Sequence, residues 1–409
     1  MRVAIESGEI HRSCTNEICL SLRITFIAVF PSPYMIDLFD AMEQDPRFHL
    51  RVYYMEREAL AAPSVNWCER PLAAYASVLP GGSISAFRAR VQFNVGFFQA
   101  LEQDWPDVVV VLGYHSVTCQ LAMYGLWLRR VPWIFWGEIP GFERRGFIGM
   151  ALRWLALRPV ACLSSGIAAI GSRALSAYEK LSKRDCPIRS IPYYCRNESL
   201  LQIKRESAVS SVIPHFLYCG QLIARKGVDL LLRAFCVVAV DNPDIRLTLV
   251  GDGPLREQLA NSIPEAIQSQ VTMAGFRETE ELAPFFANAN VFVLPSLHDG
   301  WGVVINQAVS AGMGVIASDA VGAAVDLVES GVNGLIVPPD DECALTNALR
   351  FLVDNPNEIA SFGRSSRERA ARLSPKHGVD SWYAFAKQVL RNKRGGRLLC
   401  AKSEVHDGA

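Results

Sequence analysis

The chain has 409 residues, 50% of them hydrophobic and 20% charged, and this proportion of apolar residues excludes a disordered or fibrous protein. Its 41 basic and 41 acidic residues give a net charge of zero, which argues against a protein whose partner is nucleic acid. A chain of this length is expected to form about two domains.

The eleven cysteines are scattered and include no CxxC pair. An odd number without paired spacing argues against a zinc site or a disulfide framework and favours a reducing, cytoplasmic location. No uncharged apolar run reaches the roughly 18 residues that a membrane span requires. Residues 1–20 contain three glutamates and lack the apolar segment of a secretory signal, so we expect a flexible extension there.

Residues 21–195 alternate β-like apolar runs with helical periodicity and are expected to form an N-terminal domain. They carry 18 basic and 14 acidic residues. The predicted strands are Ile24–Phe30, Arg51–Tyr54, Val108–Leu112, Trp133–Trp136, Ala168–Ile170 and Arg189–Pro192. The polar stretch 196–212 predicts a linker between two blocks of unlike charge.

Residues 213–375 carry 11 basic and 19 acidic residues and show the same alternation, which predicts a second domain. The predicted strands are Phe216–Cys219, Arg246–Val250, Val271–Ala274, Val291–Leu294, Gly314–Ala317 and Gly334–Val337, and a helix is expected over Gly227–Val240. Residues 376–409 are expected to form a helix that packs back toward the N-terminal domain, followed by a basic tail.

Short apolar strands joined by helices predict parallel sheets that are covered on both faces. Two such units in tandem predict an α/β protein with two Rossmann-like, doubly wound domains facing across a cleft. Because ligands of such sheets bind beyond the carboxyl ends of the strands, we expect the functional site in that cleft.

Two glycine-containing loops of the second domain are candidate ligand-binding elements. After the strand that ends at Cys219, a loop with Gly220 leads to Arg225 and Lys226 at the start of a helix, a good site for a diphosphate. A solvated cation pair is the alternative, although cations oppose the macrodipole at a helix start. The loop at Gly251 predicts either a structural turn or one wall of a nucleotide site.

A third stretch, residues 291–318, predicts a buried strand, a loop and a helix. Gly300 and Gly302 would let the backbone approach a ligand, and the helix start offers amide donors to a charged oxygen. Asp299 and Gln307 can both face the cleft. Asp299 as a simple N-cap, and Gln307 as a polar neighbour of apolar residues, are the structural alternatives.

Four segments resemble a known family: GQLIARKG, VGDGPLREQL, VTMAGF and PSLHDGWGVVINQAVSAGMGVIAS are similar to the donor domain of family-4 (group 1) retaining glycosyltransferases. The resemblance is specific from about residue 215 to 370 and looser over residues 21–195, at FWGEIP and IAAIGSRALSAY. It implies the GT-B fold and transfer of a hexose-type sugar, with retention, from a nucleotide-sugar donor to a glycan or lipid-linked acceptor. It also implies that no metal or other cofactor is required.

The family's signature is two glutamates separated by seven residues, the first facing the donor sugar and the second the ribose. These positions are Asp299 and Gln307 here, so both differ from the pattern. The family's basic pair for the diphosphate falls on Gln221 and Lys226, and Arg225 is the candidate substitute for the lost cation. The resemblance further implies that the donor contacts Gly220, Gln221, Gly251, Phe276, Gly300, Trp301, Gly302 and Val303.

On the acceptor side, two polar residues follow predicted strands of the first domain. His115 follows Val108–Leu112 and Glu138 follows Trp133–Trp136, and both are candidates to hydrogen-bond the sugar or the acceptor. A structural role is the alternative for each, because a lone histidine more often has one.

Residues 141–158 mix four arginines, among them Arg144 and Arg145, with aromatic and aliphatic side chains. This composition suits an anionic membrane surface, and a core helix with a solvated arginine face is the alternative. The combined prediction is a glycosyltransferase of cell-surface polysaccharide biosynthesis, cytoplasmic or peripheral on the inner face of the membrane. A GT-B nucleotide-sugar 2-epimerase and a non-catalytic sugar-nucleotide-binding paralogue are the alternative functions.

Overall fold

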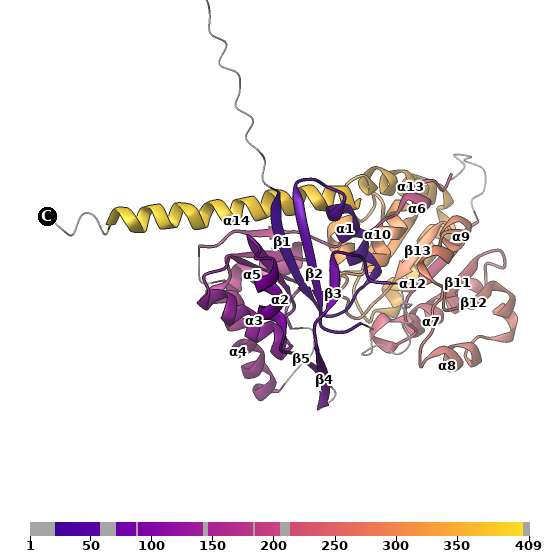
Figure 1. Ribbon diagram of the computed structural model, residues 1–409. Coiled ribbons are helices and arrows are strands. Elements are labelled where there is room, and N and C mark those ends of the chain that lie inside the picture. The colour runs from indigo at the N-terminus through magenta and orange to yellow at the C-terminus, as the bar shows by residue number, and fades with distance from the viewer. Residues whose placement is uncertain are drawn as a thin grey trace, which may run out of the picture.

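The computed structural model describes residues 21–57, 71–86, 89–141, 146–182, 185–204 and 213–403, without the side chains of residues 84–90 and 394–403. The predicted extension 1–20, Arg144, Arg145 and residues 205–212 of the predicted linker lie outside the described residues. Figure 1 shows two α/β halves side by side, with one long helix running across the first of them.

The first half is built on a seven-stranded parallel sheet with the order β3-β2-β1-β6-β7-β8-β9. Its strands are β1 (Leu22–Ala28), β2 (Phe48–Tyr54), β3 (Ala76–Val78), β6 (Val108–Leu112), β7 (Trp133–Gly137), β8 (Gly166–Ala169) and β9 (Ile188–Ser190). The central strands β6 and β7 are buried along their whole length, as expected for a sheet covered on both faces.

Helices cover both faces of this sheet. They are α1 (Pro33–Glu43), α2 (Phe97–Gln103), α3 (Val117–Leu128), α4 (Phe147–Leu163) and α5 (Ser172–Leu181), followed by the short α6 (Glu198–Leu201). α1 contributes to one buried cluster, and α2, α3, α4 and α5 contribute to a separate cluster on the other face. A hairpin of β4 (Gly81–Ala86) and β5 (Ala89–Asn94) lies beside α3.

The second half holds a six-stranded parallel sheet with the order β12-β11-β10-β13-β14-β15. Its strands are β10 (His215–Cys219), β11 (Arg246–Val250), β12 (Val271–Gly275), β13 (Val291–Leu294), β14 (Gly314–Ser318) and β15 (Gly334–Val337). Its α-helices are α7 (Val228–Ala239), α8 (Arg256–Asn261), α9 (Ala283–Asn288), α10 (Val303–Ser310), α11 (Gly322–Leu327), α12 (Glu342–Asp354) and α13 (Pro356–Ala370). Each of the twelve predicted strands overlaps an observed strand, and the predicted pair of doubly wound sheets is confirmed.

The last helix, α14 (Pro375–Ser403), returns from the second half and packs against α1 of the first (Figure 1). The buried ring of Trp382 lies edge-on to Phe26 of β1 and Trp136 of β7, with centroids 5.2 and 5.1 Å apart. Asp380 accepts a hydrogen bond of 2.6 Å from Arg47. α14 therefore completes the hydrophobic core of the first half.

Polar contacts join the halves at the ends of their strands. Asp326 of α11 accepts a hydrogen bond of 2.9 Å from the backbone N–H of Ser172, at the start of α5. The Arg173 guanidinium donates to the carbonyl oxygen of Asp319 at 2.7 Å, and the Asn306 side chain donates to the carbonyl oxygen of Tyr193 at 3.0 Å. These contacts hold the carboxyl ends of the two sheets face to face.

Candidate active site

Two adjoining cavities open between the halves at the carboxyl ends of the strands. The smaller, about 420 Å³, lies mainly against the second half, and the larger, about 660 Å³, lies mainly against the first. Five residues line both cavities: Tyr34, Glu138, Tyr193, Arg225 and Asp299. The two cavities therefore meet at a junction with two carboxylates, one guanidinium and two phenols.

The loop after β10 brings two cations to this junction. Residues Ala224–Lys226 form a 3-10 turn, and Gly227 follows in the left-handed conformation with φ of 66°. A Cβ at Gly227 would lie 2.2 Å from the carbonyl oxygen of Pro295, so only glycine lets this turn pack against the loop after β13. The close approach sets Lys226 beside Asp299, which accepts a hydrogen bond from its Nζ atom. Arg225 donates to the carbonyl oxygen of His298 at 2.7 Å.

Asp299 and Lys226 therefore form an ion pair, although they lie in two separate sequence motifs. Their side chains are only 13% and 15% exposed, which strengthens the attraction between the two charges relative to a surface pair. The backbone of Asp299 is fixed to the second half by hydrogen bonds to Ala320 and from Gly322, at 3.1 and 3.2 Å. The carboxylate is thus held at a fixed position at the junction.

The interpretation of Asp299 as an N-cap is wrong. The N-cap of α10 is Gly302, in the left-handed conformation with φ of 86°, and glycine has no side chain to cap the helix. Val303 and Val304, in the first turn of α10, line the smaller cavity. Because the first N–H groups of a helix have no partner within the helix, this end of α10 can donate to an anion in that cavity.

Glu138, which follows β7, carries the second carboxylate. Burial and, to a smaller extent, the negative charge of Asp299 raise its pKa to about 7, against the opposing effects of a hydrogen bond with Tyr193 and the charges of Lys226 and Arg225. Its backbone is fixed by the Tyr178 hydroxyl, which donates to the Glu138 carbonyl oxygen at 2.7 Å. A carboxyl with a pKa near neutrality in a cleft is typical of a functional site.

Most of the site residues predicted from the sequence lie around the two cavities. Gly220, Gln221, Lys226, Gly251, Phe276, Trp301, Gly302 and Val303 line the smaller cavity, and His115 and Gly300 line the larger. Gln307 lies a turn beyond Val303 and Val304, is half-buried, and lines neither cavity. Its predicted contact with a ribose stays a prediction.

Sequence reasoning missed Tyr34, Tyr193 and Arg153 as cleft residues. The rings of Tyr34 and Tyr193 lie 4.5 Å apart beside Glu138. Tyr193 directly follows the predicted strand Arg189–Pro192, and this position at the carboxyl end of a strand could have identified it as a cleft residue. Arg153 lies on α4 and lines the larger cavity, which links that helix to the site.

The structure also tests the core-helix interpretation of residues 141–158, of which 142–145 lie outside the described residues. Phe147, Ile148 and Trp154 of α4 are 82%, 75% and 56% exposed, so the core-helix alternative is wrong for the first half of α4. The buried residues of this helix lie in its second half, from Leu157 onward. None of the helices in the described part of the chain combines the length and the apolar character needed to cross a membrane.

Comparisons with known proteins concern both halves. Residues 213–355 match the family model described as glycosyl transferases group 1. The alpha-D-kanosaminyltransferase of Streptomyces kanamyceticus is 30% identical over 144 residues, which is 35% of this chain and 37% of that enzyme. Matches to three of the curated relatives cover between 21% and 43% of the relatives' own length.

Solved structures extend the similarity to nearly the whole chain. Sucrose-phosphate synthase from Thermosynechococcus elongatus has a TM-score of 0.63 at 22% identity and covers 93% of this chain and all of that one. The Anabaena protein HepE, solved in complex with UDP, has a TM-score of 0.63 at 16% identity and covers 91% of this chain and all of that one. These similarities confirm the predicted GT-B fold.

Proposed function

Because residues 213–355 belong to the group 1 glycosyltransferases and the chain has the GT-B fold, we propose that the protein transfers a sugar from a nucleotide-sugar donor to a hydroxyl acceptor. The observation that carries the proposal is the junction of the two cavities. There Lys226, Asp299 and Glu138 converge from the ends of three different strands. One cavity suits the donor, the other suits the acceptor, and the reacting groups would meet between them.

The donor would occupy the smaller cavity, with its diphosphate against Lys226, Arg225 and the first amides of α10. An ammonium has three N–H donors, so Lys226 can bind a phosphate oxygen while it remains hydrogen-bonded to Asp299. These cations and amides would stabilise the leaving diphosphate, and the transfer would need no metal. Asp299 would orient the hydroxyls of the donor sugar, and Gly251 and Phe276 would lie against the nucleoside. The Anabaena relative solved with UDP supports a nucleotide in this fold.

The acceptor would occupy the larger cavity, whose walls include the partly exposed Tyr34 and Tyr193. Aromatic faces pack well against the C–H faces of a sugar ring, while Glu138 offers an acceptor for the attacking hydroxyl. In the retaining reaction that we propose, this hydroxyl forms a bond to the anomeric carbon as the bond to the diphosphate breaks on the same face. The hydroxyl proton passes to the departing phosphate oxygen, and a hexose-type sugar is transferred.

The acceptor that we propose is lipid-linked, and the product is a surface polysaccharide made at the inner face of the membrane. Five residues of α3 join those of α4 in exposing large apolar side chains: Val117, Leu121, Tyr124, Trp127 and Leu128. α3 and α4 contain no acidic residue, whereas α4 contains Arg153 and Arg158. An apolar surface bordered by cations suits the interface of an anionic bilayer, and Arg153 connects it to the acceptor cavity.

A donor screen followed by a transfer assay tests this function. Thermal shift with a panel of nucleotide sugars identifies the donor, because a ligand that binds only the folded state raises Tm. We then expect release of the nucleoside diphosphate only when a hydroxyl acceptor is present, with the anomeric configuration retained in the product by NMR. Release without an acceptor would indicate the 2-epimerase. Donor binding with no transfer to any acceptor would indicate the non-catalytic paralogue.

A further inference from the structure

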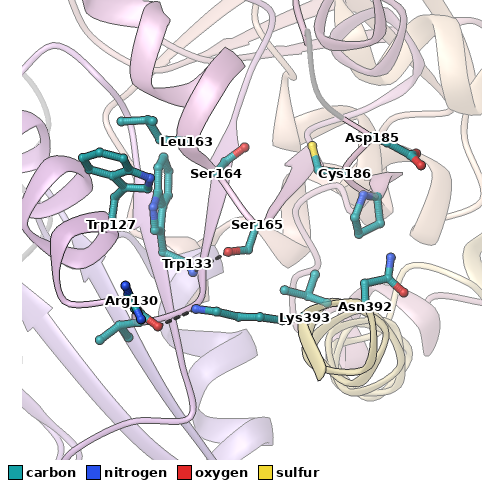
Figure 2. A pocket seen from close by; sticks show the side chains of 13 residues that line it. Trp127, Arg130, Trp133, Leu163, Ser164, Ser165, Asp185, Cys186, Asn392 and Lys393 are labelled. Carbon is teal, nitrogen blue, oxygen red and sulfur yellow. Dashed lines mark hydrogen bonds between the residues drawn. The ribbon is translucent and has the colours of Figure 1, made fainter. Parts of the chain in front are cut away.

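A separate cavity of about 490 Å³ lies at the opposite end of the first sheet from the cleft. It is bounded by the C-terminal end of α3, the start of β7, the loops that lead into β8 and β9, and α14. Figure 2 shows Trp127, Trp133 and Arg130 on one side of it and Asn392 and Lys393 of α14 on the other. Since the strands of this sheet are parallel, the amino end of β7 cannot belong to the cleft at its carboxyl end.

The polar groups around this cavity are mostly hydrogen-bond donors. Arg130 and Lys393 are cationic, and the Ser165 hydroxyl accepts from the backbone of Trp133 and retains its own proton to donate. One carboxylate, the exposed Asp185, is at the rim. A set rich in donors and cations selects an anionic ligand.

The backbone at Arg130 is held in an unfavourable conformation at this cavity. Arg130 has a φ of 57°, the left-handed region that glycine usually occupies after a helix. Its carbonyl oxygen accepts a hydrogen bond from Lys393, which fixes α14 to the end of α3 (Figure 2). A residue that keeps its charged side chain at a position suited to glycine points to a use for that side chain.

The apolar walls of the cavity and the basic residues of α14 further restrict the chemical class of the ligand. Trp127, Leu163 and Val389 line the cavity. Trp127 also belongs to the apolar stripe of α3, which is formed by its exposed apolar residues Val117, Leu121, Tyr124, Trp127 and Leu128. The sequence of α14 contains no acidic residue after Asp380, whereas it carries Arg391, Lys393, Arg394, Arg397 and Lys402. The ligand must therefore combine an anionic group with an apolar part and approach from a surface that attracts negative charge.

We infer that this cavity binds the phosphate headgroup of an anionic phospholipid. Arg130 and Lys393 contact the phosphate, Ser165 supplies a neutral donor, and the acyl chains leave along the apolar stripe of α3. The site is distinct from the cleft and does not depend on which sugar the protein transfers. It would hold the protein on the bilayer in one orientation, with the acceptor cavity at the other end of α3 and α4.

Calorimetry on the full chain with short-chain lipids below their micelle concentration tests the site without a bilayer. We expect dihexanoyl phosphatidylglycerol to bind and to raise Tm, and dihexanoyl phosphatidylcholine and inorganic phosphate to bind at least tenfold more weakly. Equal affinity for the two lipids would refute an anion site, and equal affinity for inorganic phosphate would make free phosphate the ligand and refute the lipid. No sugar substrate is present, so the proposed transferase activity is tested separately.

Variants assign the binding to this cavity. Arg130→Gly removes the cation and suits the left-handed backbone, so it should fold while its affinity for phosphatidylglycerol falls at least tenfold. Arg158→Gln is the matched control, because Arg158 lies on α4 over the ring of Trp154 and outside the cavity. An equal loss in Arg158→Gln, or none in Arg130→Gly, would overturn the inference.

Discussion

Replacing Glu138 by Gln should change stability in a pH-dependent way, because the cleft disfavours its ionised form. The pKa of this carboxyl rises from an ordinary 4.5 to about 7. A carboxyl whose pKa is raised on folding stabilises the protein while it is protonated, fully below about pH 4.5, and this contribution is lost as the pH rises through 7. The full shift corresponds to about 3 kcal/mol at 1.36 kcal/mol per pKa unit. Partial solvent access in the cleft reduces our expectation to about 1–2 kcal/mol.

Glutamine cannot ionise, so Glu138→Gln should be more stable than the parent at pH 8.5 and about equal to it at pH 5. Thermal unfolding at the two pH values measures the difference, with an expected gain in Tm of about 2–4 °C at pH 8.5. Glu102→Gln, at an exposed position of α2, is the control and should show no pH-dependent difference. The same gain at both pH values would refute the argument. In the transfer assay, we expect kcat/KM of the parent to rise with pH through about 7 and kcat/KM of Glu138→Gln to show no such rise.

Three further predictions concern the donor and the membrane. Lys226→Ala should weaken binding of the nucleotide sugar by about 1.5–3 kcal/mol, the range for a hydrogen bond to a charged group, and unchanged affinity in calorimetry would exclude the diphosphate contact. Asp299→Ala should lower turnover far more than it weakens binding of the free nucleoside diphosphate, and full turnover in this variant would refute the contact between Asp299 and the donor sugar. If Gln307 contacts the ribose, Gln307→Ala should weaken binding of the sugar donor and of the free nucleotide equally. The chain should pellet with anionic vesicles at low salt and be released at high salt, and replacing Phe147 and Trp154 of α4 by Glu should abolish pelleting; equal pelleting with neutral vesicles would argue against the cationic border.

The architecture could be predicted from the sequence because its strands are short apolar runs buried on both faces. Val108–Leu112 and Val291–Leu294 show no alternation of apolar and polar residues, and each lies at the centre of a parallel sheet. β3 was not predicted because it is a three-residue edge strand whose side chains are largely exposed. The hairpin of β4 and β5 was not predicted because it begins with two glycines and lacks a clear apolar face.

The site could be predicted in part for a topological reason. Residues that follow parallel strands gather at one edge of a sheet, so Glu138, Lys226 and Asp299 were expected in one cleft. The hydrogen bond between Lys226 and Asp299 was not expected, because these residues are 73 positions apart in the sequence and meet only where two loops pack together at Gly227. The direction in which the Gln307 side chain points could also not be predicted from the sequence. Packing of the buried face of α10 sets the rotation of that helix, and helical spacing alone does not.

The return of α14 has a consequence for the order in which the chain folds during synthesis. Domains usually fold as they leave the ribosome, the N-terminal one first. Here the core of the first half contains Trp382, Phe385 and Val389, which are translated after the entire second half. Until they arrive, the faces of Phe26 and Trp136 that they cover stay open to solvent. The half that is made first is therefore completed last, and a ribosome stalled before residue 375 would display an unfinished N-terminal half to chaperones and proteases.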